Sequence, residues 1–250
     1  MGDSREVLDR HVRKSPTKFD TDSGAPDLRR RNSAFPFRRP ATRKLANLAL
    51  LALCAAPLAA QDFERPDGWT VRFDRPGQTE ADLDTFVEMP PGWHVRSGPA
   101  ALYWGPDMDI SGDFRAEMEV FLFDPGDRRE AFGIFLGGRS MNSDAIEYTY
   151  FLIRNGGQYI IKRREGEAAP TVAPWTRHDA INSYADRGED ASVKNNLVVE
   201  ARGDSVHFSV NGTQVATVPR SEARVDGVFG FRVNHALNLH ISKIQITPLG

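Results

Sequence analysis

Aromatic and basic side chains gather on both sides of the turn at residues 155–157. Flat aromatic rings stack on the C–H face of a sugar ring, and an arginine beside them donates hydrogen bonds to its hydroxyls. The alternative is a strand that is covered on both faces, since aromatic side chains also fill the cores of β-sheet proteins. The candidate ligand-binding residues of this group are Tyr148, Tyr150, Arg154, Tyr159 and, further along the chain, Trp175.

A second polar group lies near the C-terminus, between two apolar segments. Arg232, Asn234 and His235 surround a predicted turn, and the apolar residues that alternate with them are expected to point into the core. The three polar side chains can therefore converge on a ligand. The alternative is that they only satisfy the hydrogen bonds of the turn.

Trp175 stands in residues 166–192, a segment rich in Gly, Asp, Ala and Pro. This composition predicts a long loop, and long ordered loops in compact domains usually serve function. Trp175 is therefore placed with the ligand-binding candidates, although it does not adjoin them in the sequence.

Paired acids suggest a third kind of chemistry. Glu117 and Glu119 lie two positions apart in residues 112–124, where apolar residues alternate with polar ones. On one face of a strand this spacing separates two carboxylates by about 7 Å, near the separation used in glycoside hydrolysis. The alternative is a solvated outer face of a strand.

Metal chemistry has less support in the sequence. The histidines after residue 60 form no His-x-His pair and no metalloprotease motif, so no zinc site is expected. We expect no cofactor, with calcium as the alternative, but the loop aspartates match no EF-hand spacing. The aspartates that could supply oxygen ligands are Asp107, Asp109, Asp113, Asp124 and Asp127.

Short β-strands must position these side chains. Apolar residues occupy every second position of 112–124, the period of a half-buried strand. Asn155-Gly156 and Asn211-Gly212 each separate two apolar segments, and such pairs favour tight hairpins in which both residues have positive φ. Roughly ten or more strands at these turn spacings predict an all-β fold, a two-sheet antiparallel jelly-roll sandwich. One domain is expected over residues 61–250.

Six segments follow one another in an order that is known from a protein family. They are Phe114–Val120, Phe132–Phe135, Tyr150–Gly156, Asn196–Glu200, Phe208–Gly212 and Gly227–Phe231. This order resembles the concanavalin A-like lectin/glucanase sandwiches. It is closest to the laminin G-like and 3-keto-disaccharide hydrolase-like domains of secreted bacterial proteins. The resemblance covers most of residues 69–249, and it implies a jelly roll whose concave sheet or rim loops often meet carbohydrate.

The glucanase branch of that family places its acids on one strand as Glu-x-Asp-x-(x)-Glu. The nearest match here is Glu117-Met118-Glu119, which has Glu in place of the central Asp. Phe121 and Leu122 stand where the family has its last Glu. The resemblance therefore speaks for the fold more than for hydrolysis.

The charge of the chain changes near residue 60. Residues 1–60 contain 12 basic and 6 acidic residues, whereas residues 61–250 contain 20 basic and 28 acidic residues. Nucleic-acid binding rests on clustered cations. An acidic body therefore argues against a nucleic-acid partner.

A targeting segment explains that change. An apolar run follows two basic residues and ends in small residues at Ala60, which predicts a signal peptide over residues 42–60. A disordered basic extension is expected over residues 1–41, and the alternative for the apolar run is an uncleaved anchor. Cys54 is the only cysteine and would leave with the signal. We expect an exported protein, periplasmic or extracellular, without stable membrane insertion after cleavage.

Three functions are consistent with these patterns. The first is a non-catalytic β-sandwich that binds carbohydrate or another cell-envelope ligand. The second is a glycoside-acting hydrolase of the 3-keto-disaccharide hydrolase-like type, with the acid pair or His235 in acid–base roles. The third is a structural or interaction module of the envelope.

Overall fold

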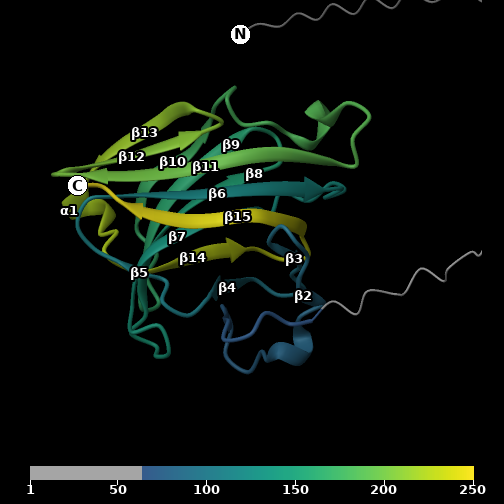
Figure 1. Cartoon of the computed structure of the whole chain (residues 1–250), viewed down its shortest axis with the longest axis horizontal. Helices are drawn as coiled ribbons and strands as arrows, with labels where there is room; N and C mark the ends of the chain where they lie inside the picture. Colours follow the sequence, from purple (N-terminus) through teal and green to yellow (C-terminus); the bar gives the residue numbers. More distant parts are fainter. Residues whose placement is uncertain (1–63) are drawn as a thin grey trace, which may run out of the picture. The chain divides into compact units, whose positions relative to one another are not determined.

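Two antiparallel β-sheets lie face to face in the protein. The structure, a computed structural model, describes residues 64–250. In Figure 1, strands β6, β11 and β15 of one sheet lie in front of β7, β8 and β9 of the other. The predicted all-β sandwich is confirmed, while the predictions for the extension and the signal peptide fall on residues outside the described part.

The first sheet has eight strands. Their order is β1 (Thr70–Phe73), β4 (Ala101–Trp104), β14 (Gly227–Val233), β7 (Ala131–Arg139), β8 (Glu147–Arg154), β9 (Gln158–Glu165) and β10 (Thr171–Arg177), with β5 (Asp109–Ile110) pairing beside β14. All of its pairings are antiparallel. We call it the eight-stranded sheet.

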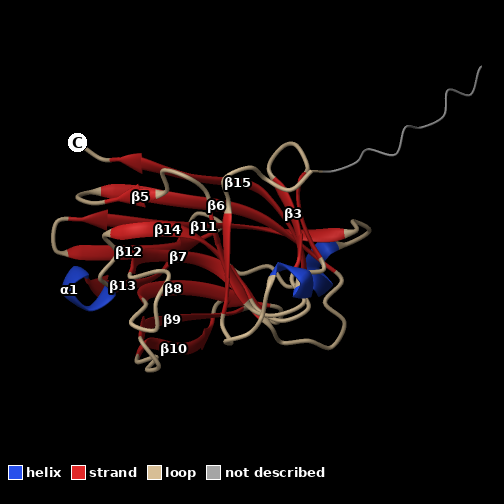
Figure 2. Ribbon diagram, turned by 90° about the horizontal axis from the view of Figure 1, so that it is seen from below, coloured by secondary structure: helices blue, strands red, loops and turns tan. Residues whose placement is uncertain are grey.

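The second sheet, the seven-stranded sheet, is also antiparallel throughout. Its order is β13 (Thr213–Pro219), β12 (Ser205–Val210), β11 (Ser192–Arg202), β6 (Phe114–Phe123), β15 (Asn238–Pro248), β3 (Trp93–Arg96) and β2 (Thr85–Glu88). The helical segments lie beyond the strand ends (Figure 2), and they are η1 (Glu80–Asp82), η2 (Tyr184–Arg187) and α1 (Arg220–Ala223). Among residues 64–250, we find no helix with the length and apolar character that a membrane crossing needs.

The predicted alternation of β6 is present in the structure. Arg115, Glu117 and Glu119, at odd-numbered positions of the strand, are only partly buried, whereas the residues at the even-numbered positions are buried. Strand side chains alternate between the two faces of a sheet. One face of β6 therefore forms core and the other meets water.

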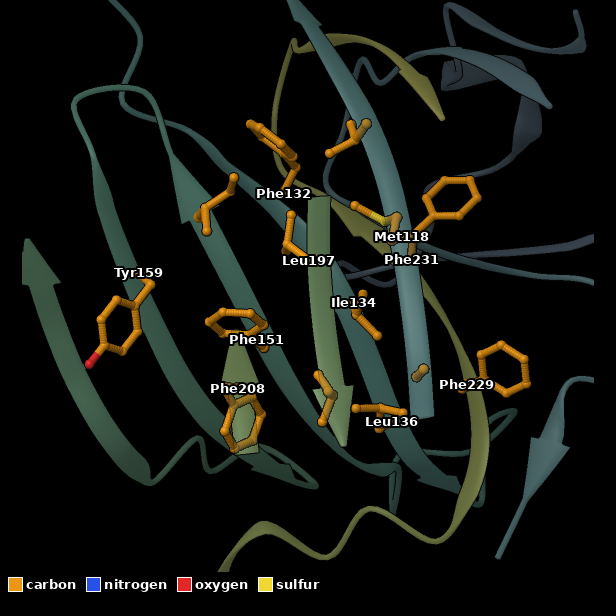
Figure 3. Packing of buried hydrophobic residues seen from close by; sticks show 14 of the residues in the cluster. Met118, Phe132, Ile134, Leu136, Phe151, Tyr159, Leu197, Phe208, Phe229 and Phe231 are labelled. Carbon is orange, nitrogen blue, oxygen red and sulfur yellow. The ribbon is translucent and has the colours of Figure 1, made fainter. Parts of the chain in front are cut away.

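The core lies between the two sheets and is built from inward side chains of both. Figure 3 shows Phe151 of the eight-stranded sheet beside Phe208 of the seven-stranded sheet, and their ring centroids are 5.2 Å apart at 62°. Met118 and Phe231 belong to the same buried cluster. Interdigitation of the two inner faces is what holds such a sandwich together.

The two predicted hairpins differ in detail. Asn211 and Gly212 both have positive φ, as predicted. At the other hairpin the prediction is wrong, because the loop has three residues and the positive φ values fall on Gly156 and Gly157. The Oδ1 atom of Asn155 instead accepts a hydrogen bond from the backbone N–H of Tyr184, 2.9 Å away, and so ties the loop to η2.

The predicted long loop over residues 166–192 is also wrong in part. Its middle forms β10, so that Trp175 lies on a strand. β10 is an edge strand whose pairing with β9 is interrupted by register shifts, and it contains Pro174. Proline is tolerated at sheet edges and bulges, and the shifts remove the regular alternation that would have revealed the strand.

Candidate functional site

The outer face of the eight-stranded sheet carries several of the predicted ligand-binding residues. Along β8, Phe151 and Ile153 join the core between the sheets. Tyr148 and Leu152 belong to separate clusters on the opposite face, with Tyr150 packed against both. The apolar character of both faces of β8 is therefore explained by a second, smaller layer of packing outside the sheet.

Arg232 is the centre of this outer layer. Its Nη1 atom donates to Asp74 Oδ1 over 2.7 Å and to the hydroxyl of Tyr148 over 3.2 Å, and its Nη2 atom donates to Asp74 Oδ2. The guanidinium carbon lies 5.4 Å from the centroid of the Tyr150 ring. Arg232 is only 8% exposed. The bidentate carboxylate provides the compensation that a buried guanidinium requires.

The charge states of this group follow from its burial. Burial alone would lower the pKa of Arg232, but the hydrogen bonds and charge of Asp74 outweigh it and raise that pKa above its ordinary value. Burial raises the pKa of both Tyr148 and Tyr150. Both phenols therefore stay neutral at pH 7 and keep a hydroxyl proton to donate.

A cleft opens beside Arg232. Its volume is about 500 Å³, and its lining comes from β1 and the loop 74–78, from the loop 142–146, and from two charged residues near the end of β9. A narrow hollow of about 20 Å³ shares part of this lining and reaches Tyr148 and Leu102. The cleft therefore leads down to the tyrosine that contacts Arg232.

Polar groups dominate the cleft walls. Arg72 holds one wall in place, because its guanidinium donates to the carbonyl of Ser143 over 2.8 Å and to the carbonyl of Met141. Exposed polar side chains face the solvent above it, and they are Arg75, Asn142, Asp144 and Glu167, with Gln78 half-buried beside them. Several hydrogen-bond donors and acceptors in one concave site suit a hydroxyl-rich ligand.

Arg154 and Trp175 form a separate pair on the same face. The guanidinium carbon of Arg154 lies 3.9 Å from the centroid of the Trp175 ring, and its Nε and Nη2 atoms donate to Gln158 Oε1 over 3.0 and 2.6 Å. Trp175 is 36% exposed, more than any other large apolar residue among those described. One face of the indole is thus occupied by an arginine within the chain itself.

Three predicted residues lie elsewhere. Tyr159 points into the core, where its hydroxyl donates to the carbonyl of Val215 over 2.8 Å, so it cannot contact a ligand on the outer face. Asn234 and His235 form the turn between β14 and β15, and His235 Nδ1 lies 3.6 Å from a carboxylate oxygen of Glu130. Neither of these two turn residues lines the cleft.

Glu117 and Glu119 lie on the outer face of the other sheet. Glu117 accepts a hydrogen bond from Asn196 Nδ2 over 3.1 Å and lies 3.2 Å from Lys243 Nζ. Glu119 accepts from Ser242 Oγ over 2.7 Å and from Lys194 Nζ over 3.0 Å. The candidate acids and the candidate sugar-binding aromatic residues therefore face opposite sides of the sandwich.

The environment of Glu119 is unsuited to a general acid. The hydrogen bond from Ser242, followed by that from Lys194, lowers the pKa of Glu119. A glycosidase acid needs a raised pKa, so that its proton is available near neutral pH.

Substitution of Glu119 by glutamine tests whether the pKa of Glu119 is lowered in the folded protein. Because the pKa of Glu119 is lowered in the folded protein, its contribution to stability is present above the ordinary glutamate range and is lost as the pH falls through the lowered pKa. We expect the variant to lose less than about 1 kcal/mol of unfolding free energy at pH 7, and we expect this difference from the native protein to become smaller as the solution becomes acidic. Urea unfolding of both proteins at several pH values measures the difference, and a difference that widens in acid would contradict the assignment.

The aspartates considered for calcium do not form a common site. Asp113 Oδ1 accepts from Arg220 Nη1 over 3.0 Å, and Asp124 Oδ1 accepts from the N–H of Gly126 over 2.8 Å within its own turn. Over residues 64–250, no three His, Cys, Asp or Glu side chains are grouped as a metal site requires.

The sequence did not reveal Asp74 or Arg72. Asp74 contacts Arg232 across 158 residues, and Arg72 contacts the loop near Ser143 across 71 residues. Charged residues in a turn-rich segment give no periodic signal that marks them as partners of a distant strand. The sequence indicated only one member of this network, Arg232, because the alternation of β14 placed it opposite the core.

Comparison with known proteins identifies the fold. No family model matches the chain, and no curated protein matches it. Among solved structures, the carbohydrate-binding module CBM66 from Bacillus subtilis is similar to 72% of this chain and 94% of its own length, at 18% identity and a TM-score of 0.51.

Two enzymes are similar to a comparable degree. A glycoside hydrolase family 16 endo-glucanase from Bacteroides ovatus is covered over 97% of its length and matches 74% of this chain, at 10% identity and a TM-score of 0.53. A Bacillus licheniformis beta-glucanase is covered over 95%, again matching 74% of this chain, at 8% identity and a TM-score of 0.51. At such identities the similarity establishes architecture, so the chain has the concanavalin A-like jelly-roll sandwich that the sequence resemblance predicted.

Proposed function

We propose that this protein is an exported, non-catalytic β-sandwich that binds carbohydrate in the cleft on the outer face of its eight-stranded sheet. The observation that carries the proposal is the cleft of about 500 Å³ beside the Arg232–Asp74–Tyr148 network. A cleft of this size accommodates a small saccharide. Export is proposed from the signal-like segment at residues 42–60.

The polarity of the cleft supports a sugar more than an apolar ligand. Asn142, Gln78 and Asp144 supply amide and carboxylate groups that can donate to and accept from hydroxyls. The Arg232 network ties Asp74 of the cleft lining to Tyr148, and groups that are held in place before binding lose less entropy when a ligand binds. The fold adds support, since a carbohydrate-binding module and two glucanases share it.

The absence of catalysis is proposed from the acid pair. Glu117 and Glu119 are both held by lysines on the opposite face of the protein. A hydrolase would need one acid with a raised pKa beside its bound substrate. Neither acid of the pair lines the cleft, and we therefore favour binding without bond cleavage.

Filling the cleft should abolish binding. Asn142 is exposed on the cleft wall, and the Asn142→Trp variant would place an indole where the ligand lies without disturbing the core. After a glycan array has identified a saccharide that the native protein binds, we expect the variant to bind it at least about tenfold more weakly by calorimetry, a loss of about 1.4 kcal/mol.

Gln245→Trp is the matched control for this experiment. Gln245 is exposed on β15 of the seven-stranded sheet, and the same substitution there should leave the affinity unchanged. If both variants bound the saccharide equally weakly, the loss of affinity would not come from filling the cleft. A native protein that binds no saccharide on the array would refute the proposal.

A further inference from the structure

A second cleft at the other end of the strands is rich in arginine. It has a volume of about 470 Å³ and lies between the loop after β6, the hairpin at residues 155–157 and η2. β6 ends on the right of Figure 1, and this loop begins there. Three arginines and a single aspartate are the charged residues of its lining, namely Arg128, Arg129, Arg187 and Asp127. We call it the arginine cleft.

Two further arginines border this cleft. Arg177 lies across its edge, with Nη1 3.5 Å from the carbonyl oxygen of Gly156, which is itself part of the lining. Arg154 is the last residue of β8 and precedes that hairpin. Three arginines therefore line this hollow of the surface, and Arg177 and Arg154 lie next to residues of its lining.

Aromatic rings and neutral groups orient two of these arginines. The guanidinium carbon of Arg187 lies 4.0 Å from the centroid of the Tyr184 ring, and its Nη1 donates to the carbonyl of the same residue over 3.0 Å. Arg154 is stacked on Trp175 in the same way. A guanidinium that is stacked on a ring keeps N–H groups along its edge for a carboxylate, sulfate or phosphate.

The arginines of this cleft lack close carboxylate partners in the part of the chain that the structure describes. Among residues 64–250, none of the five arginines forms an ion pair with a carboxylate, whereas Arg115, Arg220 and Arg232 do. The nearby carboxylate of Asp186 accepts hydrogen bonds from the N–H and the hydroxyl of Ser183, both over 2.7 Å, and it interacts with the charge of Arg177 without forming an ion pair.

Neighbouring guanidinium groups repel one another in this arrangement. Burial, followed by the charge of Arg129, lowers the pKa of Arg154. Like charges that are held together without a partner raise the free energy of the folded protein, and an anion that binds between them relieves this repulsion.

We propose that the arginine cleft binds the anionic groups of an acidic polysaccharide, either the carboxylates of uronic acids or sulfate esters. The anion preference stands on the arginine cluster alone, while the assignment to a glycan rests on the proposed function.

Calorimetry with defined oligosaccharides tests this proposal. The probes are an oligogalacturonate, a sulfated galactan oligosaccharide and a neutral cello-oligosaccharide of equal length, each titrated into the native protein at low salt. We expect an acidic probe to bind at least about tenfold more tightly than the neutral one. Its affinity should fall as salt is added.

Paired substitutions locate the effect. Arg128 and Arg129 are exposed, and the Arg128→Ala/Arg129→Ala double variant should lose at least about tenfold in affinity for the acidic probe. The Arg96→Ala/Arg139→Ala variant removes the same charge at two exposed positions outside the cleft, and it should retain the affinity. Equal losses in both variants would show a general charge effect and overturn the proposal.

Further outcomes separate the possible sources of the anion. Inorganic phosphate or sulfate that binds as tightly as the acidic oligosaccharide would overturn the assignment to a glycan, and so would a single-stranded oligonucleotide that binds more tightly. The Asn142→Trp variant should leave binding of the acidic probe intact. Failure of the proposed sugar cleft and failure of the arginine cleft are thereby distinguished.

Discussion

Replacing Asp74 with alanine is expected to lower the free energy of unfolding by about 3 kcal/mol. The substitution removes the carboxylate that holds both Nη atoms of Arg232. It would leave a guanidinium that is 8% exposed without its charged partner, and breaking a buried ion pair from one side costs about 3–5 kcal/mol. We place the loss at the lower end because the side chain of Asp74 is 30% exposed, so that water can enter. Urea unfolding followed by tryptophan fluorescence measures the effect.

Two variants show whether that loss comes from the ion pair. Asp144→Ala removes an exposed carboxylate on the wall of the same cleft and should change stability by less than about 0.5 kcal/mol. Asp74→Ala combined with Arg232→Met removes both charges, and it should be more stable than Asp74→Ala alone. An Asp74→Ala variant as stable as the native protein would contradict the geometry described for the outer face.

Replacing Phe208 with alanine is expected to cost about 3–5 kcal/mol. Phe208 is fully buried on β12, and its ring packs edge-to-face on Phe151 of the opposite sheet with centroids 5.2 Å apart. The substitution removes contacts between the two sheets and leaves a cavity that neighbouring side chains only partly fill. The midpoint of urea unfolding should fall while the dependence on urea concentration stays the same.

A double-mutant cycle gives this prediction a sharper test. Phe151→Ala should be similarly destabilising, and an aromatic pair in contact should show a coupling energy of about 0.5–1.5 kcal/mol. Val198→Ala is a useful comparison, since Val198 lies on β11 outside the central core cluster. Strictly additive losses at Phe208 and Phe151 would contradict the stacking of the two sheets.

The architecture could be predicted because alternation is a local signal. In β6, five apolar residues at every second position fixed both the strand and its buried face. The Asn211-Gly212 turn was equally local, because the positive φ of both residues follows from their chemistry. β10 was missed because a proline and register shifts at the sheet edge remove the alternation from its sequence.

The site could be predicted only in part, because its contacts join distant segments. The alternation of β14 placed Arg232 opposite the core, but the sequence left it in a group separate from Tyr148 and Tyr150 of β8. The partner of Arg232, Asp74, lies 158 residues away, and no pattern in the sequence links the two. The second apolar face of β8 left two explanations open, and the structure shows that packing covers Tyr148 while a polar cleft opens beside it.

An NMR titration with a saccharide identified by the glycan array tests the central claim most directly. Backbone amide shifts report the binding surface residue by residue in the native protein. We predict that the largest shifts fall in residues 72–78 and 142–146, which line the cleft beside Arg232. Shifts centred on Glu117 and Glu119, on the outer face of the seven-stranded sheet, would contradict the proposed binding site.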